Sequence, residues 1–288
     1  MKYNYIAQEL CSQPWAITES KLSTIVGMLL AKEKGIDVSA GAKQEIQAAA
    51  EERQAKMQSR SGKIGLMGIY GTLSHRPSIF SSGGMTSMEI RDAAKNLAAD
   101  EDISEVILDI DSQGGSVFGL PEAAKAIYEL RQKKTVTAVV NANAHSAAYF
   151  LASQASEIVS TESGYTGSIG VILPMVDESE EDANVTYIKA GEYKSEGYEK
   201  PSDDYKEHMQ GIVDVFYGQF IDAVARGRGI DSSKVEANFG QGRSFLAAEA
   251  VERGMVDRIA TLDEVIEEKI SKLKSKKNRE RRMRSALL

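Results

Sequence analysis

The sequence predicts an α/β protein with a mainly parallel sheet, built from residues 62–262. Three observations lead to this class. Short apolar runs alternate with segments of helical periodicity, glycines follow several of the apolar runs, and Pro121 stands near the start of a helical segment, where proline is tolerated. Such alternation is typical of βαβ units, whose right-handed crossovers join parallel strands.

The elements follow one another in a regular order. The expected strands are residues 64–70, 106–110, 136–140, 158–160 and 185–189. The expected helices are residues 85–99, 121–132, 147–154 and 203–228. Gly229 follows the last and longest of these helices and is a suitable residue to end it.

The two ends of the chain differ from this central region. Residues 1–61 are expected to form a helical extension, because residues 16–34 carry apolar side chains at helical spacing and residues 42–58 contain neither Gly nor Pro. Residues 263–288 form a third zone, strongly basic between positions 272 and 284. We expect a solvated tail or a helix that extends into solvent there, with docking on an acidic partner as the alternative.

Composition excludes several classes of protein. The chain of 288 residues carries a net charge of −7, which argues against nucleic-acid binding except through the basic tail. Cys11 is the single cysteine, so no internal disulfide can form. The sequence has no secretory signal and no apolar stretch near the ~20 residues of a membrane span. We therefore expect a soluble cytoplasmic protein that does not bind a membrane, and the ligand spacing of a metal site is absent.

Two glycines follow the expected strand 106–110. Gly114 and Gly115 lie between this strand and the helix that starts near Pro121, which predicts a tight turn. Backbone N–H groups left bare in such a turn can hold an anion. The alternative is a simple tight loop, since the lysine and serine of a phosphate-binding loop do not follow.

Ser146 occupies a similar place after the expected strand 136–140. A serine at the start of a helix is most often a cap. However, small residues follow Ser146 and leave room for a substrate, and the Ala147 N–H would point the same way as the serine, as acyl transfer requires. The neighbouring His145 is a poor base for Ser146, because adjacent helix residues do not face each other.

Lys194 is the alternative candidate for a base. It follows the expected strand 185–189 and stands beside Tyr193, with glycines nearby. A lysine ordinarily titrates near ~10.4, and desolvation can lower its pKa to ~7–8, which suits a general base. A lysine on the surface is the alternative interpretation.

Taken together, these motifs resemble a known family. They occur in the order 111–116, 145–149, 165–171 and 191–194, and a segment from Gly242 to Asp257 closes the series. Over roughly residues 62–262 the chain resembles the signal peptide peptidase A (protease IV) family. Three further segments, residues 13–16, 71–74 and 83–86, are similar to the head maturation proteases of tailed phages.

The resemblance implies a ClpP/crotonase-like fold and a serine endopeptidase that needs no cofactor. Its substrates would be capsid and scaffold proteins inside the prohead, in the host cytoplasm, and the chain itself. Family members form homo-oligomeric rings, in which the serine and the lysine can come from neighbouring subunits.

The resemblance also implies roles for single residues. Ser146 would be the nucleophile, Lys194 the general base, and Ser168 a hydrogen-bond partner that orients the lysine.

The backbone N–H groups of Gly115 and Ala147 would form the oxyanion hole, and Gly114 would shape the turn. This sequence departs from many relatives, which have proline in place of Gln113 and glycines in place of Ala147 and Ala148. We expect the two alanines to narrow the space beside the serine.

Two alternatives come from other classes of protein. The first is a crotonase-type acyl-CoA enzyme, a hydratase or thioesterase, which would need acidic residues in the site in place of the serine and lysine. The second is a catalytically silent structural protein of the phage head, whose helical arm and basic tail contact other head proteins. Retention of both Ser146 and Lys194 argues against the second.

Overall fold

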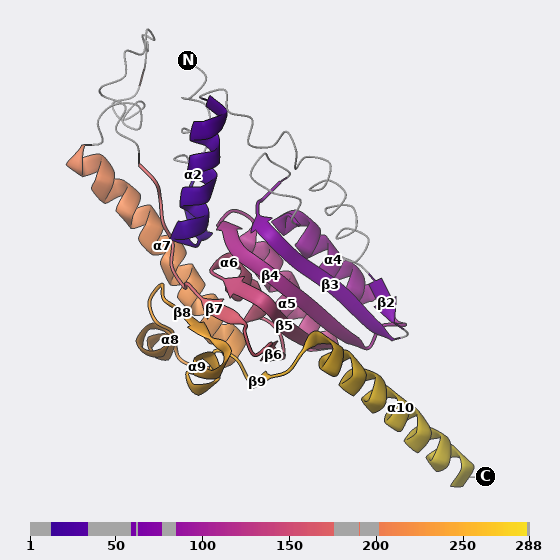
Figure 1. Ribbon diagram of the computed structural model, residues 1–288. Coiled ribbons are helices and arrows are strands. Elements are labelled where there is room, and N and C mark those ends of the chain that lie inside the picture. Colours follow the sequence, from indigo (N-terminus) through magenta and orange to yellow (C-terminus); the bar gives the residue numbers. More distant parts are fainter. Residues whose placement is uncertain are drawn as a thin grey trace.

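The computed structural model describes residues 13–33, 59–61, 63–76, 85–175, 190 and 202–286. In this part of the chain, nine strands form one sheet, whose central path runs β2-β3-β4-β5-β6-β9 (Figure 1). From β3 to β9 neighbouring strands on this path are parallel, whereas β2 is antiparallel to β3. The strands on the path are β2 (Ser59–Ser61), β3 (Ile64–Leu73), β4 (Glu105–Ser116), β5 (Thr135–His145), β6 (Glu157–Ser160) and β9 (Arg258–Ile259). The predicted α/β class with a mainly parallel sheet is confirmed.

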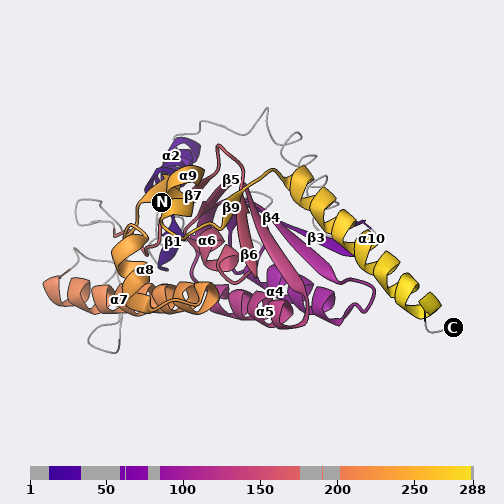
Figure 2. The ribbon, with the colours of Figure 1, turned by 90° about the horizontal axis from the view of Figure 1, so that it is seen from below.

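Helices cover both faces of the sheet (Figure 2). Successive residues of β4 point to opposite faces of the sheet, and the neighbours Ile107 and Leu108 are both fully buried. Leu108 belongs to the main core with α4 (Ser87–Ala99), α5 (Leu120–Lys133) and α6 (Ala147–Ala152). Ile107 packs on the other face, near Val265 of α10 (Leu262–Ala286). Because helices cover both faces of the sheet, side chains on both faces are buried, and the strands are nearly continuous apolar runs.

The two central strands extend further than their apolar runs. β4 continues past Ile110 to Ser116, and β5 continues to His145. The β4–β5 pairing shifts register between Ile110 and Ser112, and Ala142 has a φ of 126°. The prediction of a tight turn at Gly114 and Gly115 is therefore wrong, because both residues lie within β4.

The strand β1 (Trp15–Ile17) pairs antiparallel with the end of β4. The predicted helix 16–34 begins only at Glu19, as α2 (Glu19–Glu33). Trp15 and Ile17 pack against Ile25 of this helix, which holds the strand and the helix together. The expected helix 42–58 and the expected strand 185–189 lie outside the described residues.

The remaining elements complete the edge of the sheet beyond β5. The long helix α7 (Asp203–Arg228) has the predicted bounds: the Ser202 side chain accepts a hydrogen bond from Tyr205 N at its start, and Gly229 ends it with a φ of 67°. The other elements are α8 (Ser232–Asn238), α9 (Ala247–Glu252), β7 (Tyr165–Gly167) and β8 (Ser244–Leu246). β7 pairs with both β5 and β8.

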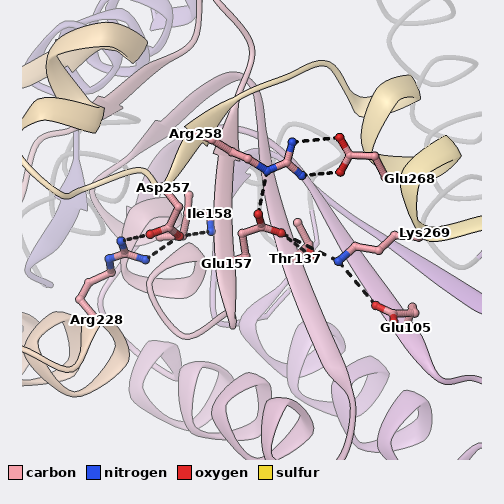
Figure 3. A network of polar contacts seen from close by, with 9 residues as sticks. All are labelled: Glu105, Thr137, Glu157, Ile158, Arg228, Asp257, Arg258, Glu268 and Lys269. Atoms are coloured by element: carbon pink, nitrogen blue, oxygen red, sulfur yellow. Dashed lines mark hydrogen bonds and ion pairs between the residues drawn. The ribbon is translucent and has the colours of Figure 1, made fainter. Parts of the chain in front are cut away.

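The basic C-terminal zone is a helix that begins on the sheet. Lys269 of α10 is buried, with its Nζ 3.5 Å from Glu105 Oε2 and 3.9 Å from Glu157 Oε2 (Figure 3). Arg258 bridges Glu157 and Glu268 at 2.7 Å each (Figure 3). Beyond this network α10 extends away from the sheet (Figure 1). Of the two forms expected for this zone, the structure has the helix.

Candidate active site

Ser146 stands at the junction of β5 and α6, fully buried. Its backbone has φ 51° and ψ −118°, a conformation that a residue with a Cβ rarely adopts. The side chain makes no capping hydrogen bond to α6, so the interpretation as a helix cap is not supported. Strained residues of this kind occur preferentially at functional sites, and a serine on a sharp strand-to-helix turn is a known arrangement for a nucleophile.

Two hydrogen bonds tie Ser146 to the segment that follows β7. The Ser146 N–H donates to Gly167 O (2.7 Å), and the Ser146 Oγ donates to Gly170 O (3.4 Å). Gly167 pairs with His145 in the β5–β7 ladder, which fixes this segment beside the serine. The hydroxyl is thus held against the backbone of residues 167–170.

The end of β4 packs directly against the serine turn. A Cβ atom on Gly114 would lie 3.1 Å from Ala147 N and 3.1 Å from His145 O, and the φ of Gly114 is +94°. A Cβ atom on Gly115 would lie 1.9 Å from Leu73 O of β3. Both positions therefore require glycine, and the end of β4 at Gly114 lies against the turn at Ala147.

Ser168 lies one residue beyond the carbonyl that accepts the Ser146 N–H. Its φ is +52°, and its N–H donates to Arg243 O (2.8 Å). The expected partner of Ser168, Lys194, lies outside the described residues.

His145 has the properties of a core residue. It is 2% exposed, and its ring packs edge-on against Tyr165 with 4.9 Å between the ring centres. Burial lowers the pKa of His145 to about 4, although the nearby charge of Asp111 opposes this shift. The imidazole is therefore neutral at neutral pH, and the described residues give it no hydrogen bond to Ser146.

A second polar group, missed by the sequence analysis, lies on β4. Tyr70 Oη donates to Asp109 Oδ2 (2.5 Å) beside a cavity of about 420 Å³ that Lys21 also lines. Burial raises the pKa of Asp109, and hydrogen bonds from Tyr70 and Asn141 oppose the rise. The sequence feature that could have revealed this group is the carboxylate of Asp109 inside the apolar run 106–110. The described residues contain no cluster able to hold a metal.

The described helices also bear on a membrane role. None of them is both long and apolar enough to span a bilayer.

Comparison with known proteins places the chain in a family. The sequence model "Peptidase family S49" matches residues 128–276, a range that includes Ser146, Ser168 and Lys194. The head-tail preconnector protein GP5 of Enterobacteria phage P21 is 30% identical over 222 residues, which cover 74% of this chain and 44% of that protein. The putative signal peptide peptidase SppA of Enterococcus faecium is 30% identical over 181 residues, covering 60% and 52%.

Two further proteins are similar. The capsid assembly protease C of Escherichia phage lambda is 28% identical over 235 residues, covering 79% of this chain and 53% of that protein. Among solved structures, a point mutant of ClpP1 from Listeria monocytogenes has a TM-score of 0.42 at 15% identity, covering 67% of this chain and 91% of that one. The chain spans about half the length of the three sequence relatives. The match over residues 128–276, more than half of the chain, shows that the chain belongs to peptidase family S49.

Proposed function

We propose that the chain is a serine endopeptidase with Ser146 as nucleophile and Lys194 as general base. The conformation of Ser146 carries this proposal: a buried, uncapped serine with positive φ stands on a strand-to-helix turn, against a strand end where only glycine fits. Family membership supports a peptidase. Neutral, buried His145 does not compete for the role of base.

The proposed reaction follows from these positions. The Ser146 Oγ attacks the scissile carbonyl while the neutral amine of Lys194 takes its proton. The N–H groups of Gly115 and Ala147 stabilise the oxyanion, and loss of one such donor typically costs ~3–4 kcal/mol. Lys194 then protonates the leaving amine, and water hydrolyses the acyl-enzyme with the lysine again as base. Ser168 would orient the lysine.

The proposed substrates are proteins of a phage head. Two of the relatives are phage proteins, and the name of one describes a capsid assembly protease. By analogy, this chain would cleave capsid and scaffold proteins, and itself, during head maturation in the host cytoplasm. Residues 62–262 would form the peptidase domain of a homo-oligomeric ring, flanked by the N-terminal arm and by α10.

Co-expression with the capsid and scaffold proteins of the same phage tests this function. Intact mass measurement should show trimmed chains with the wild type and with Ser163→Ala, an exposed serine that serves as the matched control. Ser146→Ala should leave every chain whole. Equal trimming by the wild type and Ser146→Ala would contradict the proposed nucleophile.

A further inference from the structure

The strand β1 lies in a groove beside Ser146. On one side it pairs with the end of β4, where Ala16 is opposite Gly115 and Ile17 is opposite Gly114. On the other side, Trp15 exchanges two backbone hydrogen bonds with Ile172, of 2.8 and 2.9 Å. Ile172 follows the segment whose Gly170 carbonyl accepts from the Ser146 hydroxyl. An extended segment of the chain thus fills the space between the two backbone edges that flank the serine.

The register of β1 places a carbonyl group at the candidate oxyanion hole. Thr18 N donates to Gln113 O (3.2 Å), and Val117 N donates to Pro14 O (3.5 Å). Because bonded and non-bonded pairs alternate in an antiparallel ladder, the pair between these two, Ala16 with Gly115, is a bonded one, and the Gly115 N–H faces the Ala16 carbonyl.

A second observation places the same carbonyl beside Ala147. A Cβ atom on Gly114 would lie 2.2 Å from Ala16 O and 3.1 Å from Ala147 N. The Ala16 carbonyl and the Ala147 N–H therefore border the same small space.

The side chain of Ala16 fills a pocket, as a side chain of a bound peptide would. It is fully buried and faces an apolar pocket with only about 10 Å³ left empty. The pocket wall comes from the main core and includes Val117, Leu120, Phe150 and Phe220. Trp15 and Ile17, on the opposite face of β1, pack against α2 instead.

We infer that β1 occupies the peptide-binding groove of the site in the manner of a substrate, with Ala16 at the position of the residue whose carbonyl is attacked. This inference rests on the proposed peptidase function. The groove would take an extended peptide by strand pairing, with a small apolar side chain in the pocket. A protein substrate could enter only after β1 withdraws, so the strand acts as an internal competitor.

Full-length variants test this inference. Trp15→Ala removes the fully buried side chain that anchors β1, and Ser23→Ala, on the exposed face of α2, is the matched control. Hydrogen exchange measured by mass spectrometry reports departure of β1 without reference to activity. Exchange of residues 114–117 should rise in Trp15→Ala and stay at the wild-type level in Ser23→Ala.

The second measurement is the rate at which a fluorophosphonate labels Ser146. We expect Trp15→Ala to react roughly tenfold faster than the wild type or more, since each 1.4 kcal/mol lost from the anchor shifts the population tenfold. A synthetic peptide with the sequence of residues 13–18 should slow the reaction again. If Trp15→Ala does not fold, Ala16→Pro removes one N–H from the ladder and leaves the Trp15 cluster intact.

The outcomes separate the two proposals. Equal labelling rates in the wild type and in Trp15→Ala, with exchange raised in the latter, would overturn the inference and leave the peptidase function standing. If Ser146 stays unlabelled in every variant although exchange at residues 114–117 has risen, the proposed nucleophile fails, and the inference fails with it.

Discussion

Ser146 shows at the scale of one residue how strain and function are connected. Its positive φ costs on the order of 1–3 kcal/mol in a residue with a Cβ. Glycine adopts this conformation without strain, whereas alanine retains the Cβ. The two variants Ser146→Gly and Ser146→Ala therefore separate the strain from the loss of the hydroxyl.

We predict that Ser146→Gly is more stable than Ser146→Ala by about 1 kcal/mol. Ordinarily glycine is the less stable of the two, because it loses more conformational freedom on folding. Denaturant unfolding of both variants measures the difference, and both should be inactive. A less stable glycine variant would mean that the conformation of Ser146 is not strained.

His145 makes a pH-dependent contribution to stability. Its pKa is about 4 in the folded chain, lowered by burial, against about 6.5 when unfolded. Between these values the unfolded chain binds the extra proton, so acidification favours unfolding. The contribution is fully present above pH ~6.5 and is lost as the pH falls toward ~4, up to about 3 kcal/mol in total.

We predict that His145→Gln flattens the fall in stability between pH ~6.5 and ~4. The comparison protein is the wild type, whose pH dependence contains the contribution of His145. Chemical denaturation at several pH values measures both. An unaltered slope in His145→Gln would show that burial does not lower the pKa of His145 in the folded chain.

At the scale of elements, the end of β4 lies in close contact with the backbone of β3. Alanine at Gly115 would place its Cβ 1.9 Å from Leu73 O, and because the atoms that it meets belong to the backbone of β3, they cannot rotate away. We predict that Gly115→Ala lowers the free energy of unfolding by more than ~2 kcal/mol, the range of overpacked sites. As a control, Gly211→Ala in the exposed face of α7 meets no atom within 4 Å and should stabilise the helix by ~0.5–1 kcal/mol. Equal stability of Gly115→Ala and the wild type would contradict the packing of β3 on β4.

The first turns of α10 depend on a buried charge. Lys269 is 9% exposed at its side chain and lies between Glu105 and Glu157. Removing one member of a buried pair typically costs ~3–5 kcal/mol, because the other charge remains buried. We predict a loss of this size for Lys269→Met by thermal or denaturant unfolding, and a smaller loss when Glu105→Met is added. The exposed Lys274→Met is the control, and a Lys269 effect no larger than that of Lys274 would contradict the docking.

The sequence predicted the elements with strong local signals. Helix α7 has its expected bounds because a serine cap and a glycine stand at its ends. The extension of β4 through Gly114 and the strand β1 could not be predicted in this way. Both depend on pairing between residues about 100 positions apart, and the helical spacing of residues 16–34 concealed the three-residue strand. The carboxylate of Asp109 was visible inside an apolar run, but its environment depends on Tyr70 and Asn141 from other strands.

At the scale of the whole molecule, the fold brings together segments that are far apart in the sequence. The strand β1, the turn at Ser146 and residues 167–172 meet where the central strands β4 and β5 end. On the far face, α10 is fixed by the ion pairs of Glu105, Glu157 and Glu268 (Figure 3). The candidate site and the basic helix α10 thus lie on separate parts of the molecule. Substitutions that disturb one of them should leave the other folded.

The most direct test of the central claim is to locate the residue that a fluorophosphonate modifies. The full chain, the Trp15→Ala variant, Ser146→Ala and Lys194→Arg would be incubated at neutral pH, digested and mapped by mass spectrometry. We predict one adduct, on Ser146, in the first two proteins, and none in Ser146→Ala. Lys194→Arg should lose the adduct too, since arginine stays protonated and cannot accept the proton of the serine. Modification at another residue, or an undiminished adduct on Ser146 in Lys194→Arg, would contradict the proposed serine–lysine pair.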